Sequence, residues 1–376
     1  MEPTAGARAT RLGHLTCWIL GVGAVLTWNS MLSAMDYYLQ VFSDYYPSRV
    51  LPLVYQPISM LVVGILTAFE SEIITQYRVV CGFWLFFFVS FFIPVLDLAS
   101  SGLGSFGTYV GVCISTALFG ASGGCVEAGV VGVLSYTHTG LLQSFTAGVA
   151  ASGVATSCMR LITKASFTED RAGLRKGALA FFFISAIVEL VCVVLYIFVF
   201  PRFTKRVQSE AIETEPRLSN TKLLKANLDY VFNIFIIHVV TLAIFPGILA
   251  KHSQTLQLGS WYVVTLVTVF NVGDMAGRYF ICLNFLKLKN RTMLFWLVLV
   301  RFALVPAFYF GSQYEGWTIV LCFFLGTSNG HFSVCVFVNA PKGYKVSEQS
   351  ALGNILVFAL LSGVFVGEVA SWMWLL

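Results

Sequence analysis

Charged residues are scarce in this chain of 376 amino acids. Asp, Glu, Lys and Arg make up 11% of it, against about 25% in ordinary soluble domains. Apolar residues account for 57% of the chain, Phe alone occurs 34 times, and the mean hydropathy is +0.81. This composition excludes a soluble globular domain and predicts an all-α polytopic membrane protein.

The motifs of several function classes are also missing. None of the nine cysteines forms a CxxC pair, and the five histidines are scattered without HExxH spacing, so neither a disulfide framework nor a metal site is indicated. A P-loop motif is absent, so we expect no enzyme and no cofactor. The net charge of +5 comes from short segments between apolar runs, which argues for a lipid bilayer and against nucleic acid as the partner.

The apolar runs fit eleven transmembrane helices, since one span needs about 20 apolar residues. They lie at 12–39, 49–69, 78–99, 106–134, 141–163, 176–200, 230–250, 259–285, 291–311, 316–340 and 347–374. One extended polar stretch, 201–229, divides them. We therefore predict a six-helix N-terminal half at 1–200, a cytosolic linker at 201–229 and a five-helix C-terminal half at 230–376.

The basic residues predict a cytosolic N-terminus. Fourteen of the 23 Lys and Arg residues fall in segments on the N-terminal side of the membrane and six on the opposite side, and cytoplasmic loops carry the excess. The basic segment 164–176 lies on the outer side and goes against this rule.

The eighth predicted span carries the polar residues Asn271, Asp274 and Arg278. Asp274 and Arg278 are four residues apart, so on a helix they share a face and can pair. A charge at mid-bilayer costs about 2.5–3.5 kcal/mol even on insertion scales. Two explanations stay open at this point: a buried ion pair that holds helices together, or the lining of a path for a polar solute.

Trp28 and Asn29 lie deep in the first predicted span, too far from its ends for an interfacial aromatic belt. An indole face can stack on a planar ring, and an Asn side chain both donates and accepts hydrogen bonds. We therefore expect both residues to border a cavity.

Three carboxyl side chains also fall within predicted spans: Glu127, Glu189 and Glu368. Intramembrane carboxyl groups are candidates for proton coupling. Glu127 is the one we single out, for proton coupling or for base recognition, whereas Glu368 lies close enough to a helix end to reach water.

Two further features concern helix shape and packing. Phe245-Pro246 interrupts the seventh predicted span, and because proline frees a backbone carbonyl we expect a hinge or gate there. Ser328-Asn329-Gly330 in the tenth span predicts tight helix contact or a lining position. Arg301 is expected to be a buried cation with a structural partner.

Taken in order along the chain, these motifs resemble the equilibrative nucleoside transporter family. The resemblance rests on Gly21-x-Gly23 with Trp28-Asn29, Phe245-Pro246, Phe270-Asn271-x-x-Asp274-x-x-Gly277-Arg278, Arg301-x-x-x-x-Pro306, and Ser328-Asn329-Gly330 with Pro341-Lys342. Three segments resemble the plant branch of that family: Tyr55-Gln56-Pro57, Gly173-Leu174-Arg175-Lys176-Gly177 and Glu189-Leu190-Val191-Cys192.

The resemblance implies a major-facilitator-like bundle of 6+5 helices that moves purine and pyrimidine nucleosides across the plasma membrane by alternating access. It also implies that Trp28 borders the nucleobase and that Asp274 and Arg278 hydrogen-bond the ribose hydroxyls, with Asn271 supporting the pair. Coupling to protons stays open. The alternatives are a carrier of another polar solute, such as a nucleobase or sugar, and a non-transporting membrane receptor on the same fold.

One departure from the family concerns base recognition. Gly124 occupies the fourth-span position where many members carry a Gln that contacts the base. Gln56 and Glu127 are the candidate substitutes.

Overall fold

The protein is described by a computed structural model that covers residues 11–69, 74–204, 217–245, 258–259, 261–311 and 313–372. All regular structure within these ranges is helical. The long helices of the first part are α1 (Arg11–Ser33), α3 (Pro47–Ala68), α4 (Thr75–Ala99), α5 (Phe106–Thr137), α6 (Thr139–Ser166) and α7 (Arg171–Val194), with the short α2 (Met35–Val41), η1 (Ser43–Tyr45) and η2 (Leu195–Val199). The second part comprises α9 (Asn220–Ala226), α10 (Leu228–Ile244), α12 (Trp261–Tyr279), η3 (Phe280–Cys282), η4 (Asn284–Leu286), α13 (Arg291–Val300), η5 (Arg301–Ala303), α14 (Leu304–Gly311), α15 (Glu315–Asn339) and α16 (Val346–Ser371).

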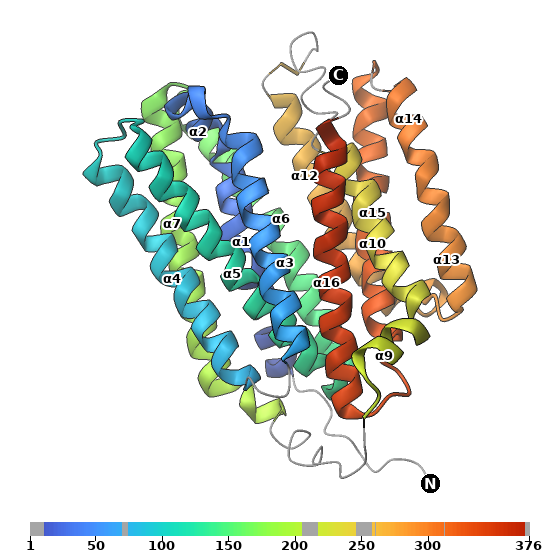
Figure 1. Cartoon of the computed structure of the whole chain (residues 1–376). Helices are drawn as coiled ribbons and strands as arrows, with labels where there is room; N and C mark the ends of the chain where they lie inside the picture. Colours follow the sequence, from blue (N-terminus) through green and yellow to red (C-terminus); the bar gives the residue numbers. More distant parts are fainter. Residues whose placement is uncertain are drawn as a thin grey trace.

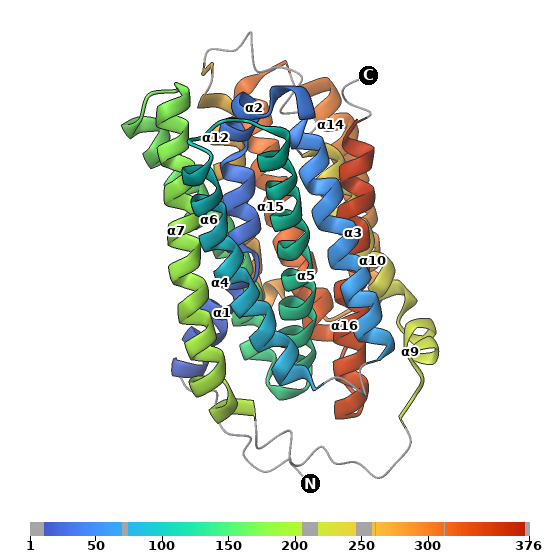
Figure 2. The same cartoon turned by 60° about the vertical axis from the view of Figure 1, so that its left-hand side comes forward.

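The helices form two sets that lie side by side (Figure 1). Helices α1–α7, the N-terminal set, pack mainly against one another, as do α9–α16, the C-terminal set. The two sets meet where α6 packs against α12 and where α16 packs against α3 and α5. α1 begins and α16 ends at opposite ends of the bundle (Figures 1 and 2). The centre of the bundle is therefore formed where α6 contacts α12 and where α16 contacts α3 and α5.

Most of the long helices fit a bilayer. Among the described residues, nine helices are long and apolar enough to cross it, and the pair α9 and α10, bent by 77°, would make ten. The predicted eleven spans correspond to these nine, to α10 and to α12. α12 is 19 residues long and contains Asn271, Asp274 and Arg278, so its polar face sets it apart from the apolar helices. The count of eleven stays a prediction.

Two of the predicted spans are broken. The run 12–39 divides into α1 and α2, and α2 is held by Tyr37, whose hydroxyl donates to Asp97 of α4. The run 291–311 divides at η5, five residues before Pro306. Pro306 has no N–H to bond the carbonyl four residues earlier, in η5, so the helix tightens there into a 3₁₀ turn.

Small residues let α12 and α15 touch through their backbones. A Cβ on Gly277 would lie 2.1 Å from the Thr327 carbonyl oxygen, and one on Gly330 would lie 2.0 Å from the Asp274 carbonyl oxygen. Neither distance leaves room for any side chain. Because close approach of this kind drives helix association in membranes, it fixes α15 directly beside the polar face of α12.

The basic segment that went against the charge rule is paired with local acids. Within the segment, Lys164 pairs with Glu169 and Arg175 with Asp97, and Arg160, which precedes the segment, pairs with Asp36. These contacts tie α6, α2, α4 and the start of α7 together at one end of the N-terminal set. Lys164 and Arg175 of this segment therefore have a structural use.

Candidate functional site

Asp274 and Arg278 form the predicted ion pair. Both project from α12, and the Arg278 Nε donates to Asp274 Oδ2 over 3.2 Å. Asp274 is 6% exposed and Arg278 9% exposed. The pair is thus buried inside the bundle and screened little by solvent.

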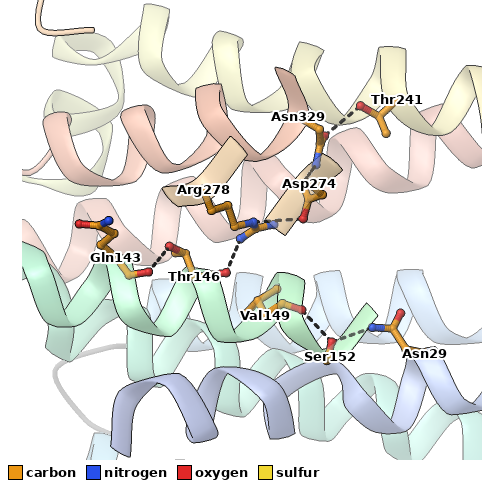
Figure 3. A network of polar contacts seen from close by, with 9 residues as sticks. All are labelled: Asn29, Gln143, Thr146, Val149, Ser152, Thr241, Asp274, Arg278 and Asn329. Carbon is orange, nitrogen blue, oxygen red and sulfur yellow. Dashed lines mark hydrogen bonds and ion pairs between the residues drawn. The ribbon is translucent and has the colours of Figure 1, made fainter. Parts of the chain in front are cut away.

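Asp274 is also the centre of a longer polar chain (Figure 3). Asn329 of α15 donates from Nδ2 to Asp274 Oδ1 over 2.7 Å, and Thr241 of α10 donates to Asn329 Oδ1 over 2.9 Å. The Arg301 Nη2 in turn donates to the Thr241 hydroxyl over 2.7 Å. Asp274 therefore lies between two guanidinium groups, one in direct contact and one reached through two neutral side chains.

Arg301 is anchored by neutral groups, as expected for a structural cation. Besides Thr241, it donates to the carbonyl of Ile237 over 2.7 Å and to the Ser328 hydroxyl over 3.0 Å. It is 3% exposed. These hydrogen bonds of Arg301 hold η5 against α10 and α15.

Arg278 connects this hydrogen-bond network to the N-terminal set. Its Nη1 donates to the backbone carbonyl of Thr146 in α6 over 2.8 Å (Figure 3). Thr146 lies inside α6, and because a backbone carbonyl has two lone pairs it can accept from Arg278 in addition to its helical N–H partner. The guanidinium is therefore shared between a carboxylate of one set and a neutral acceptor of the other.

Asn271 contacts α6 rather than Asp274. Its amide donates to the Gly153 carbonyl over 3.1 Å and to the Ser157 hydroxyl over 2.8 Å. The supporting role that we expected of Asn271 at the ion pair is taken by Asn329. On the other face of α6, Asn29 of α1 donates to the Ser152 hydroxyl over 2.8 Å, so Asn29 and Asn271 hold adjoining residues of one helix.

Trp28 is buried and has an aromatic partner. Its indole stacks on the ring of Tyr55 in α3, with ring centroids 4.1 Å apart and an interplanar angle of 18°. Trp28 is 7% exposed and Tyr55 4%. The two rings make a planar, apolar patch where α1 meets α3.

Gln56 and Glu368 join the two sets beside this patch. The Gln56 amide, next in the chain to Tyr55, hydrogen-bonds the Glu368 carboxyl group of α16. Glu368 is partly exposed and its Oε2 is buried, so the interpretation that its carboxyl group reaches water stays a prediction. Glu127 of α5 lies within electrostatic range of both Tyr55 and Arg278, so it faces the same region.

Gly124 has no space for a side chain. A Cβ there would lie 2.9 Å from the Ser59 carbonyl oxygen and 3.1 Å from the Val62 side chain, both on α3. The close packing of α5 against α3 therefore explains why a longer residue is missing at this position. Any group that contacts the base has to come from elsewhere.

The other sequence candidates lie outside this region or outside the described residues. Phe245 ends α10 and stacks on Phe270 of α12, with centroids 4.7 Å apart, whereas Pro246 lies outside the described residues, so the predicted hinge stays a prediction. Glu189 is fully buried between α7 and α1, where it accepts from Thr27 over 3.0 Å. In the part of the chain that the structure describes, no group of three His, Cys, Asp or Glu side chains is arranged to hold a metal ion.

The sequence pointed to only part of this network. Asn329 was noted as a packing or lining residue, while Thr241 and the Thr146 carbonyl were missed. A single Thr in an apolar run carries no distinguishing signal, and a backbone carbonyl carries none at all.

Comparison with known proteins identifies the family. The family model described as Nucleoside transporter matches residues 113–228 and 201–376. The chain belongs to the nucleoside transporter family. It is 44% identical to Equilibrative nucleotide transporter 3 of Arabidopsis thaliana, over 96% of this chain and 94% of that protein, and 42% identical to Equilibrative nucleotide transporter 5 of the same plant over the same shares. As a member of this family it is a transporter and not an enzyme.

Solved structures show the fold of this family member. The major facilitator proton:xylose symporter XylE superposes with a TM-score of 0.68 at 10% identity, covering 96% of this chain and 87% of XylE. The fucose:proton symporter FucP of E. coli gives 0.61 at 9% identity, covering 98% and 97%. The expected major-facilitator-like fold is confirmed; at this identity the likeness concerns the fold alone.

Proposed function

We propose that this family member carries purine and pyrimidine nucleosides across the membrane by alternating access, with the N-terminal and C-terminal sets as the two moving bodies. The observation that carries the proposal is the buried Asp274–Arg278 pair at the junction of the sets. Membership of the nucleoside transporter family supports the substrate class.

The chemistry of the pair suits a ribose. Vicinal hydroxyls both donate and accept hydrogen bonds, a carboxylate accepts them, and a guanidinium donates several from a fixed fork. We assign the ribose to Asp274 and Arg278, and the base to the side of Trp28. Asn29, Gln56 and Asn271 are proposed to line the same site.

Alternating access requires that contacts between the sets break and re-form. The Arg278–Thr146 and Asn271–Ser157 bonds join α12 to α6, and Gln56–Glu368 joins α3 to α16. Each is a neutral or singly charged hydrogen bond worth about 0.5–3 kcal/mol net. Contacts of this strength stabilise one arrangement of the two sets but can be broken during transport. Phe245-Pro246 is proposed as the hinge or gate beside these contacts.

The test is uptake of labelled adenosine and uridine into cells that lack their own nucleoside carriers, with unlabelled nucleosides, free bases and hexoses as competitors. We expect ribosides to compete and hexoses not to. Competition by hexoses alone would favour a sugar carrier, and competition by bases alone would favour a nucleobase carrier. A protein at the cell surface that takes up none of these would favour a receptor.

We propose Glu127 as the group that couples transport to protons, if coupling occurs, because it lies within electrostatic range of Arg278 and forms no ion pair with it among the described residues. Glu127→Gln should then abolish the dependence of uptake on external pH. Glu189→Gln is the matched control, since Glu189 is buried within the N-terminal set against Thr27 and should leave the pH dependence unchanged. If Glu127→Gln keeps the wild-type pH profile, Glu127 has no coupling role.

We further propose a plasma-membrane location, eleven spans and a cytosolic N-terminus, in line with the excess of basic residues in the segments assigned to that side. Epitope tags at the two ends test this. The N-terminal tag should be stained only after permeabilisation, and the C-terminal tag in intact cells as well. Staining of both tags on one side would require an even number of spans.

A further inference from the structure

Two polar side chains of opposite sets meet next to the Trp28–Tyr55 stack and leave acceptors unused. Gln56 is 3% exposed, and its amide bonds the Glu368 carboxyl group. The remaining oxygens, Gln56 Oε1 and Glu368 Oε2, are buried and have no hydrogen-bond partner among the described residues. Buried polar atoms without a partner are rare in native proteins and call for an explanation.

We propose that Gln56 and Glu368 recognise the amino-bearing edge of the nucleobase, so that the transporter prefers adenosine over inosine and cytidine over uridine. The inference rests on the proposed nucleoside transport and assigns the base end of the same site.

The unused atoms fix the chemistry of the ligand. When Glu368 is ionised, its Oε2 and the Gln56 Oε1 only accept hydrogen bonds, and an exocyclic amino group offers two N–H donors. Adenosine and cytidine carry such a group, whereas inosine and uridine carry an oxo group at the same ring position. The oxo group lies beside a single ring N–H, so this edge can satisfy at most one of the two oxygens and brings a further acceptor against the other, which costs more than a missing bond alone.

The surroundings suit a flat ring held by its edge. Tyr55 directly precedes Gln56, stacks on Trp28 with centroids 4.1 Å apart, and lies within electrostatic range of Glu368. Bases stack on aromatic side chains of this kind without regard to sequence, so selectivity has to come from groups at the ring edge. Gly124 cannot supply one, because α3 lies 2.9 Å from where its Cβ would be.

The pair also belongs to different sets, which ties recognition to movement. Gln56 lies on α3 and Glu368 on α16, and these helices pack against each other across the junction. A base that bonds Gln56 Oε1 and Glu368 Oε2 adds to the direct bond between the two side chains and keeps α16 close to α3. A base that bonds neither side chain gains no hydrogen bond that offsets the cost of moving α16 away from α3.

The experiment measures initial uptake of adenosine, inosine, cytidine and uridine, each well below its KM, in cells lacking their own carriers. The variants are Glu368→Gln and Gln56→Met, with Glu315→Gln as the control; Glu315 lies in the first turn of α15, where it accepts from the Leu258 N–H over 3.4 Å. The wild type and Glu315→Gln should prefer the amino-bearing partner of each pair by about tenfold, in the range of base discrimination by paired hydrogen bonds. Both site variants should bring the two ratios close to one.

The remaining outcomes overturn the proposal. A purely structural pair would lower the uptake of all four nucleosides by one factor and leave the ratios unchanged in both variants. Equal uptake of adenosine and inosine by the wild type refutes the inference without any variant, while nucleoside transport itself stands. A wild type that takes up none of the four refutes the proposed function, and if neither variant reaches the cell surface the pair is a structural contact.

Discussion

Asp274→Asn tests whether the buried pair contacts the ribose or only holds helices together. Asp274 accepts from Arg278 Nε at Oδ2, 3.2 Å, and from Asn329 Nδ2 at Oδ1, 2.7 Å. An asparagine has one acceptor and one donor end, so whichever way its amide turns, one of these two contacts becomes donor against donor. The substitution therefore keeps the shape of the side chain and removes one charge-assisted hydrogen bond.

The magnitude follows from the burial of the partners. Breaking one side of a buried ion pair costs about 3–5 kcal/mol, because the other charge is left uncompensated. Arg278 would retain a neutral partner, the Thr146 carbonyl. That cost lowers the stability of the fold, whereas uptake reports the lost bond between the ribose and a charged group, which is worth about 1.5–3 kcal/mol. At about 1.36 kcal/mol per tenfold, kcat/KM for adenosine should fall by roughly 10- to 100-fold.

A comparison of substrates separates the two explanations. In the wild type, 3′-deoxyadenosine and 2′-deoxyadenosine each lack one bond to a charged group, worth about 1.5–3 kcal/mol, so we expect roughly 10- to 100-fold slower uptake than for adenosine. In Asp274→Asn the bond is already weakened, and the ratio should shrink to about the few-fold value of a neutral hydrogen bond. Uptake is normalised to the amount of protein at the cell surface. If the variant slows all three substrates by one factor and retains the wild-type ratios, the pair is structural and the ribose assignment is wrong.

Three further substitutions test the packing around the site. Gly330→Ala should abolish uptake and lower the Tm of the purified protein, because its Cβ would lie 2.0 Å from the Asp274 carbonyl oxygen. The control is Gly316→Ala on the same helix, whose Cβ meets nothing within 4 Å and which should behave like the wild type. Equal Tm values for the two variants would contradict the close α12–α15 contact. Gly124→Ala should lower the Tm in the same way, since its Cβ would lie 2.9 Å from the Ser59 carbonyl oxygen, with Gly107→Ala on α5, whose nearest atom is 4.0 Å away, as its control. Arg301→Lys loses the fork that bonds Thr241 and the Ile237 carbonyl, so the Tm should fall and uptake of all nucleosides should fall by one factor; a changed preference among them would mean that Arg301 acts on the substrate.

The sequence predicted features that lie within one helix better than contacts between helices. The four-residue spacing of Asp274 and Arg278 predicted their pair correctly, because helical geometry alone decides it. The predicted spans 106–134 and 141–163 lie close to α5 and α6, because the length of an apolar run also depends on one helix alone. Asn329 was singled out through its motif, but its contact with Asp274 depends on how α15 packs against α12.

Contacts between helices depend on small residues that periodicity does not reveal. In a membrane there is little hydrophobic driving force between apolar helices, so close packing at glycines decides which faces meet. Gly277 and Gly330 place α15 on Asp274, and the packing of α3 at Gly124 removes a side chain from the site. The bond between Gln56 and Glu368 follows from such packing, and the position of neither residue in the sequence reveals it.

The polar groups at the ribose end of the site are paired with protein groups, and this bears on selectivity. Arg278 bonds the Thr146 carbonyl, Asn271 bonds Ser157, and Asn329 bonds Asp274. A nucleoside that enters must replace some of these bonds, so each new contact yields only the small net gain of an exchange. A solute that displaces them without replacing them leaves buried donors or acceptors unpaired, which costs more than the exchange yields. On the proposed function, the transporter therefore selects nucleosides chiefly by the penalty that it imposes on other solutes, and it can do so without the tight binding that would slow release.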